Sequence, residues 1–453
     1  MDASPGYPRS NPCLSFWLQG VRNSPLLGHR TTPELPVAAD VAIVGSGLSG
    51  VAIAYFLLTG PNPPARVTMF EAREACDGAT GRNGGHCRPD CYRDYTHYKQ
   101  AFGREQALKI IQNEMDTLNL MEEIIKKEGI ECDFWRGHSY DVPMDQTVAD
   151  YLAASYEEFV ADGGPVEGIV EQTLDAEAAR RATRCPSATA AYRFPAGSLY
   201  PYKLVAALLT RCIDKHGLNL QTHTPVRAVV PGVGGAGWTV QTDRGAVAAG
   251  KVVYATNAFT ATLLPEFRGH IWPFRGQCAA VVPPKAYAGA NMLTHTYGLA
   301  YGDYLIQRPA DGVIIFGGAR RSMPVEKLLG NTDDSVRFPE MTRALTEALP
   351  RYFGGWAPEA TGEGLVHDWS GVPYVGELHD KPGAFVCAGH HGHGMARIMT
   401  CARGLAALIQ GAPWASTGLP ECFQPTRERL AAPAQAVVHN IGKQDIIGTA
   451  ELS

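Results

Sequence analysis

The chain has 453 residues, a formal net charge of −5, and a composition that is 45% hydrophobic and 19% charged. These values are typical of a globular protein with two or more lobes, and without surplus positive charge they predict neither a nucleic-acid partner nor an anionic membrane surface. The 11 cysteines form no Cys-x-x-Cys pair, which favours free thiols in a reducing compartment. Because we find no signal sequence and no apolar run of about 18 residues, we expect a cytoplasmic protein without a membrane span.

The first informative motif lies in residues 40–60, DVAIVGSGLSGVAIAYFLLTG. The apolar run Val41–Val44 predicts a buried parallel strand, which leads into a Gly-x-Gly-x-x-Gly turn and an apolar helix through Leu58. In such a unit the glycines permit a tight turn, let backbone approach a pyrophosphate, and let the helix pack close to the strand. A second strand, RVTMFEA, ends at Glu71, which can accept hydrogen bonds from a ribose. The unit predicts a dinucleotide site at Gly45, Ser46, Gly47, Leu48, Ser49, Gly50 and Glu71.

The charge of Glu71 narrows the choice of dinucleotide, because a carboxylate repels the 2′-phosphate of NADP and leaves NAD or FAD. A second glycine-rich loop follows in residues 73–90, REACDGATGRNGGHCRPD. A nicotinamide enzyme would normally have another helix here, whereas the longer FAD needs further backbone contacts for its ring. An ordinary flexible loop is the alternative interpretation.

The stretch GATGRNGG, placed after a strand that ends in Glu, resembles the flavin-proximal motif of the FAD-dependent amine and amino-acid oxidase family. This family includes the D-amino-acid oxidase, glycine oxidase and sarcosine oxidase types, and the Arg-Asn-Gly-Gly form is most similar to the gamma-glutamylputrescine oxidase type. The resemblance extends from about Asn11 to Pro425. It implies that FAD also contacts Ala72, Arg73, Gly81, Arg82, Asn83, Gly84, Gly85, Val226 and Thr256.

The resemblance implies an α/β (α+β overall) architecture with two domains. A discontinuous, Rossmann-like FAD-binding domain is expected from residues 38–95, 190–268 and 360–425. A substrate domain of a mixed β-sheet with helices is expected from residues 96–189 and 269–359, where the sequence has helical periodicity in the first part and strand-like runs with a Pro-Ala-Asp-Gly turn in the second. Residues 1–37 are a lead-in and 426–453 a tail.

The resemblance also implies a reaction: a hydride moves from the carbon next to an amine nitrogen to flavin N5, the resulting imine is hydrolysed, and O2 reoxidises the flavin. Three residues are expected to assist. His86 directly follows the second glycine loop, Arg275 resembles an arginine at the domain crossing, and Lys285 lies near the position of an oxygen-activating lysine in sarcosine oxidases. The alternatives are a structural ion pair for Arg275 and an exposed surface position for Lys285.

Five residues are expected to line the substrate pocket. They are Tyr301, Tyr304, Arg308, Trp369 and His391. Tyr301, Tyr304 and Arg308 lie around a predicted strand, and for them the alternative is a partly exposed face of a sheet.

The stretch CAGHHGHGMA, residues 387–396, combines three histidines with three glycines. It follows a strand-like run, AFVCAG, and precedes an apolar helical stretch, so it forms a second strand–glycine–helix unit. It resembles the family's C-terminal motif, whose backbone N–H groups stabilise the reduced flavin. That implies flavin contacts from Gly392, His393, Gly394 and Met395. Because three histidines on an extended glycine turn do not easily face one point, we expect no metal.

One segment departs from the family pattern. Trp369-Ser370-Gly371 runs almost directly into Val372-Pro373-Tyr374, whereas relatives have a further stretch between these halves. Sarcosine-oxidase-type enzymes attach flavin through a cysteine in this segment; because residues 369–376 contain none, we expect non-covalent FAD.

The leading hypothesis is therefore an FAD-dependent oxidase or dehydrogenase of a primary or secondary amine or amino acid. Two alternatives remain: a flavin oxidoreductase of specialised metabolism that oxidises an amine or closes a ring, and a flavin-binding protein that has lost turnover. The expected partners are a small amine or amino-acid substrate and O2.

Overall fold

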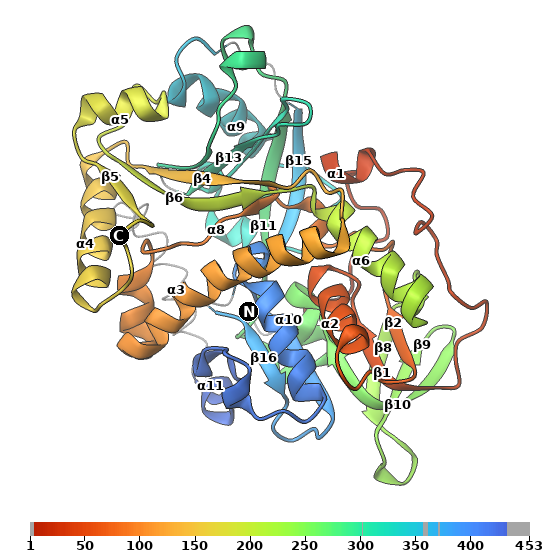
Figure 1. Ribbon diagram of the computed structural model, residues 1–453. Helices are drawn as coiled ribbons and strands as arrows, with labels where there is room; N and C mark the ends of the chain where they lie inside the picture. The colour runs from red at the N-terminus through yellow and green to blue at the C-terminus, as the bar shows by residue number, and fades with distance from the viewer. Residues whose placement is uncertain (1–3, 301, 357–360, 370–371, 433–453) are drawn as a thin grey trace.

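The computed structural model describes residues 4–300, 302–356, 361–369 and 372–432, with only the backbone described for residues 361–369. Two β-sheets and the helices around them form this part of the chain (Figure 1). The predicted α/β class is confirmed. Within the described residues no helix is long and apolar enough to cross a membrane.

The first sheet contains the predicted dinucleotide unit. Its strands are β1 (Ala38–Val44), β2 (Val67–Phe70), β7 (Asn219–Gln221), β8 (Val226–Pro231), β9 (Trp238–Thr242), β10 (Gly245–Tyr254), β16 (Tyr374–Glu377) and β17 (Ala384–Ala388). The main path is β16-β17-β10-β1-β2-β7, parallel from β17 to β7, and β8 and β9 join it as an antiparallel ribbon on β10. Val41 and Ile43 of β1 face the helices, whereas Ala42 and Val44 face the opposite core, as alternation along a strand requires.

Three long helices cover one face of this sheet: α2 (Leu48–Thr59), α6 (Pro201–His216) and α10 (Gly394–Ile409). The sequence predicted α2 and α10 as apolar helical stretches that follow a glycine turn. Pro201 occupies the first turn of α6, where its missing N–H costs nothing, and Gly217 ends the helix with a φ of 69°. The short β7 follows α6, and Val226 begins β8 after the turn that comes next.

The second sheet is mixed, as predicted. Its order is β15-β11-β14-β13-β12-β4-β6-β3, with β5 paired to β6, and only β4 and β12 pair in parallel among the described strands. The strands are β3 (His86–Cys87), β4 (Trp135–Val142), β5 (Glu171–Thr173), β6 (Ala191–Ser198), β11 (Trp272–Val281), β12 (Thr296–Leu299), β13 (Asp303–Gln307), β14 (Ile314–Gly317) and β15 (Thr361–Trp369). The predicted Pro-Ala-Asp-Gly turn connects β13 and β14.

The remaining described helices lie around the second sheet and the chain ends, except α7, which packs beside β8 of the first sheet. They are α1 (Phe16–Gln19), α3 (Tyr95–Glu128), α4 (Gln146–Ala161), α5 (Ala176–Thr183), α7 (Thr260–Leu263), α8 (Val325–Leu328), α9 (Pro339–Tyr352) and α11 (Arg427–Ala431). The long α3, bent at Gly103, crosses between the second sheet and the helices of the first (Figure 1). One core cluster joins α2, α3, α6 and α10 to a face of the second sheet.

The predicted domain boundaries differ from the two sheets at three strands. β3, β6 and β15 belong to the second sheet, although their residues were assigned to the FAD-binding ranges 38–95, 190–268 and 360–425. β6 ends at Ser198 and α6 begins at Pro201, so only two residues separate the second sheet from the helix that covers the first. β15 pairs along nearly its whole length with β11, a long-range contact without a local pattern.

A buried ion pair connects α3 and α10. Arg397 donates from Nε to Glu114 Oε1 at 2.7 Å and from Nη2 to the Tyr98 hydroxyl at 2.6 Å, and both charged side chains are fully buried. One turn along, the hydroxyls of Thr117 and Thr400 are 2.6 Å apart. These contacts hold the start of α10 against the helix that separates the two sheets.

We expect Arg397→Met to lower the free energy of unfolding by about 3–5 kcal/mol, because it leaves the Glu114 carboxylate buried without its counter-charge. Lys126→Met is the matched control, since it breaks the exposed Lys126–Glu122 pair of the same helix and is expected to cost less than about 1 kcal/mol. Thermal and urea unfolding measure both. The double variant Arg397→Met/Glu114→Met should recover much of the loss, and equal losses for Arg397→Met and Lys126→Met would contradict the assignment.

Candidate functional site

A single cavity of about 400 Å³ receives residues from both sheets. It is lined by the turn between β1 and α2, the end of β2, the second glycine loop, the start of β8, the end of β10 and the start of α10. Residues of α4, β4 and β12 line its other end. The two predicted glycine motifs and the C-terminal motif therefore meet at one place.

The turn after β1 has the geometry of a backbone-lined anion site. Gly45 has a φ of 109°, and a Cβ there would lie 2.5 Å from the Ala255 carbonyl oxygen. A Cβ on Gly50 would lie 2.0 Å from the Gly45 carbonyl oxygen, so α2 could not approach the turn with any larger residue. Gly47 is the N-cap of α2 and lines the cavity, which leaves the positive end of the helix directed at it.

Glu71 lies directly after β2 and is held by hydrogen bonds from this turn. Its Oε2 accepts from Ser46 N at 3.0 Å and Ser46 Oγ at 2.7 Å, and its Oε1 accepts from Arg73 N at 3.0 Å. A carboxylate has about four acceptor positions, so Glu71 keeps acceptor capacity for a ligand in the cavity that it lines. This fits the ribose of a dinucleotide.

The second glycine loop forms a 3-10 turn, Ala79–Arg82, and then a tight approach to the second sheet. A Cβ on Gly84 would lie 2.4 Å from the ring of Tyr304, so the loop fits only as glycine at that position. The loop is anchored by Trp17 of α1, whose Nε1 donates to the Asn83 carbonyl oxygen at 2.6 Å. Arg82 points away from the cavity and pairs with Asp77 at 2.5 Å.

The predicted cofactor residues divide according to these contacts. Those that line the cavity are Gly45, Gly47, Leu48, Ser49, Glu71, Ala72, Arg73, Asn83, Gly84, Val226, Thr256, Gly392, His393, Gly394 and Met395. Those that support it from behind, without lining it, are Ser46, Gly50, Gly81, Arg82 and Gly85.

The three histidines of the C-terminal motif have different environments. His390 is 2% exposed, and its Nε2 lies 3.3 Å from Ser49 Oγ and 3.8 Å from Cys387 Sγ, which links the start of α10 to the start of α2. His391 has a φ of 55° and lines the cavity together with Gly392. His393 faces α3, with Nδ1 3.7 Å from both Asp90 and Glu114. The histidines therefore do not converge on one point.

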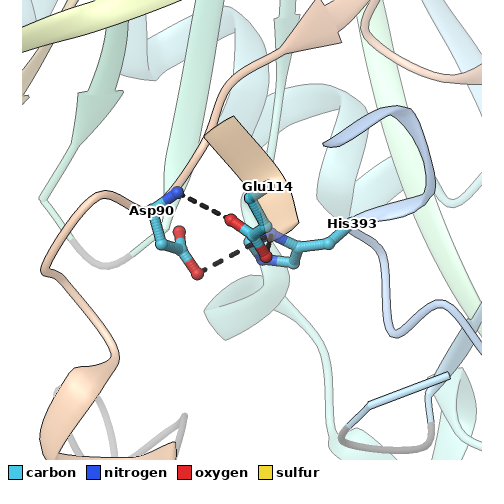
Figure 2. A group of neighbouring side chains, drawn as sticks. All are labelled: Asp90, Glu114 and His393. Atoms are coloured by element: carbon cyan, nitrogen blue, oxygen red, sulfur yellow. Dashed lines mark hydrogen bonds and ion pairs between the residues drawn. The ribbon is translucent and has the colours of Figure 1, made fainter. Parts of the chain in front are cut away.

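The structure brings together a different set of potential metal ligands, Asp90, Glu114 and His393, whose ligand atoms all lie within 4.8 Å of one another (Figure 2). Asp90 Oδ1 already pairs with Arg93 at 2.9 Å, and Glu114 Oε1 with Arg397 at 2.7 Å. Burial disfavours the charged form of Asp90, but the cations around it outweigh this and hold its pKa below the usual range. Because arginines supply the counter-charge that a metal would, the cluster is better explained as an ion-pair network.

Sequence reasoning missed the charged end of the cavity, which is lined by Arg88, Arg93, Asp94 and Asp141. Arg88 donates from Nε to Ser139 Oγ at 2.7 Å and pairs through Nη2 with Asp141. Arg93 lies between Asp90 and Asp141, and its buried Nε has no hydrogen-bond partner among the residues that the structure describes. The run HCRPDCYRDY, directly after Gly85, was the sequence signal that could have indicated these charged residues.

His86 lies at the junction of the two ends of the cavity. It pairs on β3 with Ser198, and its ring centroid is 5.8 Å from that of Tyr304. Within the described part of the chain its buried Nε2 has no hydrogen-bond partner. Burial, followed by the charges of Arg88 and Arg93, holds its pKa well below the usual range, so the ring is neutral. Tyr304 directs its hydroxyl toward Cys278 Sγ, 3.0 Å away, and presents its ring to the cavity.

Three predicted site residues do not line the cavity, which corrects their expected positions. Lys285 is exposed in a 3-10 turn beyond β11. Arg275 is fully buried in β11, where Nη2 donates to the Val336 carbonyl oxygen at 2.7 Å. Arg308 pairs with Asp311 at 2.9 Å and with Asp133 at 3.1 Å. Arg275 and Arg308 therefore bind protein groups outside the cavity, and Lys285 faces solvent.

Two further predicted residues have limited descriptions. Tyr301 lies outside the described residues. The backbone of Trp369 ends β15 opposite Trp272, and its side chain lies outside the described part of the structure, as do residues 370–371 of the shortened segment.

The buried state of His390 predicts a pH dependence of stability. Burial lowers the pKa of His390 to about 3, and the charge of Arg397 adds to this. An unfolded histidine has a pKa of about 6.5, so below this pH the unfolded chain binds a proton that the folded one does not. The free energy of unfolding should therefore fall as the pH drops from about 6.5 toward about 3, by up to about 1.4 kcal/mol per pH unit for this group.

In His390→Asn this part of the slope should disappear, as measured by urea unfolding at a series of pH values. His216→Asn, at the exposed end of α6, is the control and should keep the wild-type slope. An unchanged slope in His390→Asn would show that His390 is protonated in the folded protein.

Comparisons with known proteins agree with this geometry. Residues 40–408 match the family model described as FAD dependent oxidoreductase. The chain is 23% identical over 390 residues to gamma-glutamylputrescine oxidoreductase of Escherichia coli (strain K12), covering 83% of this chain and 84% of that protein. It is 25% identical over 369 residues to glycine oxidase of Geobacillus kaustophilus (strain HTA426), covering 79% and 89%.

Two solved structures show the same fold. The crystal structure of glycine oxidase from Geobacillus kaustophilus has a TM-score of 0.69 at 21% identity, over 86% of this chain and 99% of that one. L-proline dehydrogenase from P. horikoshii has a TM-score of 0.70 at 19% identity, over 87% and 98%. Because the family model spans most of the chain and its glycine motifs line one cavity, the protein belongs to the family of FAD-dependent oxidoreductases.

Proposed function

We propose that this protein oxidises the C–N bond of a primary or secondary amine or amino acid to an imine, and that O2 reoxidises the reduced flavin. When bound, FAD supplies the hydride acceptor at N5 of its ring. The observation that carries the proposal is the polar chamber of Arg88, Arg93, Asp94 and Asp141, which continues the same cavity beyond the glycine-lined part. The names of the relatives refer to gamma-glutamylputrescine, glycine and L-proline, each of which has an amine nitrogen.

The cofactor is proposed to bind to backbone groups of the two strand–glycine–helix units. Gly47 and Leu48 at the start of α2 suit the pyrophosphate, and Gly394 and Met395 at the start of α10 suit the reduced ring, because both helix ends carry partial positive charge. Residues 369–376 contain no cysteine, which supports non-covalent binding.

The charges of the chamber support a small substrate that itself carries charge. The buried Nε of Arg93, which no described residue engages, suits an acceptor such as a carboxylate. Asp94 accepts from the Tyr151 hydroxyl at 2.6 Å through one oxygen, and burial raises its pKa. The apolar side chains of Val148 and Leu152 close the wall of the chamber on the side of α4.

His86 is the proposed polar contact between substrate and flavin. Its neutral ring cannot supply a positive charge, but the unpartnered Nε2 can donate or accept one hydrogen bond. A positioning contribution is therefore expected, with no requirement for a base, because the cofactor performs the difficult step.

The central experiment is anaerobic titration of the purified yellow protein with a panel of amines and amino acids. We expect the flavin absorbance to bleach with at least one of them, and to return with formation of hydrogen peroxide when air is admitted. Bleaching with slow return in air would indicate a dehydrogenase. No bleaching with any amine would contradict the proposed function and favour the alternatives of another flavin substrate or lost turnover.

Acid precipitation should leave the yellow colour in solution, because the FAD is not covalently attached.

His86→Phe tests the contact near the ring. We expect the rate of flavin reduction by substrate to fall about tenfold, the loss of roughly one hydrogen bond, and His86→Asn to recover part of it. Because His86 is neutral, we expect the rate of flavin reduction in the wild type to show no break near pH 6.5. The pH profile of His86→Asn should therefore have the same shape as that of the wild type in this range. His216→Asn, an exposed position, is the control. Wild-type rates in His86→Phe would remove the residue from the site.

A further inference from the structure

The N-terminal segment contributes to the cavity, although the sequence analysis gave it no role. Gly6, Tyr7 and Pro8 line the same cavity as the dinucleotide unit. They precede β1 by some thirty positions, so they reach the site only because the chain folds back over it. We call residues Ser4–Arg9 the N-terminal strap.

One flank of the strap is held by α7 and β8. Thr262 of α7 donates from Oγ1 to the Gly6 carbonyl oxygen. The Tyr7 hydroxyl donates to the Arg227 carbonyl oxygen at 3.1 Å, and the Tyr7 ring lies 4.5 Å from the guanidinium of Arg227. That guanidinium also pairs with Asp243 at 2.6 Å, which fixes it in place under the ring.

The other flank is held by the segment that follows β2. Arg73 donates from Nη1 to the Arg9 carbonyl oxygen at 3.1 Å. The Arg73 side chain is buried and is itself fixed by Asp77 at 3.1 Å and Asp334 at 2.9 Å. A few residues on, Cys13 N donates to the Asp334 carbonyl oxygen at 2.7 Å.

Glu71 lies between these two flanks. It precedes Arg73 by two residues, and its carbonyl oxygen accepts from Thr224 N at 2.8 Å, just before Val226 at the start of β8. The strap therefore crosses the cavity at the carboxylate that faces the ribose of the dinucleotide. The second glycine loop and His86, by contrast, meet Tyr304 of the second sheet.

We propose that the N-terminal strap forms the outer wall of the adenosine end of the FAD site, and that FAD leaves the protein only after the strap detaches. The proposal rests on FAD as the cofactor and does not depend on the amine substrate. The strap makes few contacts, and Tyr7 is 38% exposed. The strap can therefore open locally while the two sheets stay folded.

The test measures FAD release from the holoenzyme. After dilution, flavin fluorescence rises as FAD leaves, which gives the dissociation rate, and titration gives the dissociation constant. We expect Tyr7→Ala to raise both about tenfold, because it removes the hydroxyl contact and the cation–π contact together, and deletion of residues 2–9 to raise them further. Leu14→Ala is the matched control, since Leu14 is 41% exposed in the same lead-in and does not line the cavity.

The position of the strap is tested by displacing FAD with ADP, which shares the adenosine end only. The affinity for ADP should fall in Tyr7→Ala by the same factor as the affinity for FAD. FAD release at the wild-type rate in both strap variants, or weaker FAD binding with unchanged ADP binding, overturns the proposal. If the deletion variant does not fold, Tyr7→Ala alone decides. An amine panel that fails to bleach the flavin would overturn the proposed function but would leave these release measurements valid.

Discussion

The structure depends on the close approach of two helix N-termini, those of α2 and α10. Each begins at a glycine turn after a parallel strand, and the hydrogen bond between Ser49 Oγ and His390 Nε2 joins the two starts. Two positive helix ends that face one space repel each other unless negative charge lies between them. A diphosphate and a ring that becomes anionic on reduction meet this requirement, so the arrangement that would cost free energy in an empty protein becomes favourable around the cofactor.

The same helix α10 is fixed at its other side by buried charge. Arg397 pairs with Glu114 of α3, Arg93 pairs with Asp90 and Asp141, and Arg88 pairs with Asp141. Because each of these buried carboxylates is balanced by an arginine, the loss of Arg397 leaves Glu114 buried without its counter-charge. The helix α10 therefore contacts both the glycine-lined part of the cavity and the network of buried charges.

Local patterns were sufficient to predict the elements that hold the cofactor. The glycine spacing before α2 and the strand–glycine–helix pattern around residues 384–409 depend on neighbours in sequence, and the structure has both. Arg88 and Arg93 escaped prediction because their partner Asp141 is about fifty residues away and β4 pairs with β12 far along the chain. Lys285 was predicted from a loose family similarity and Arg308 from its place at the end of a predicted strand. The structure places Lys285 in an exposed turn and pairs Arg308 with the nearby Asp311 and with Asp133, which is distant in sequence.

The two ends of the cavity present different kinds of chemical group to a ligand. At the cofactor end backbone N–H groups and one carboxylate, Glu71, face the ligand, and the nearby cation Arg73 is already paired with Asp77 and Asp334. In the charged chamber, which is the proposed substrate site, the groups that face the cavity are the side chains of Arg88, Arg93, Asp94 and Asp141. Backbone recognition requires glycines at a few positions and tolerates change elsewhere, whereas side-chain recognition changes with every substitution. This division is consistent with a fold shared by chains only 19–21% identical, and under the proposed function it assigns substrate choice to the chamber formed by Arg88, Arg93, Asp94 and Asp141.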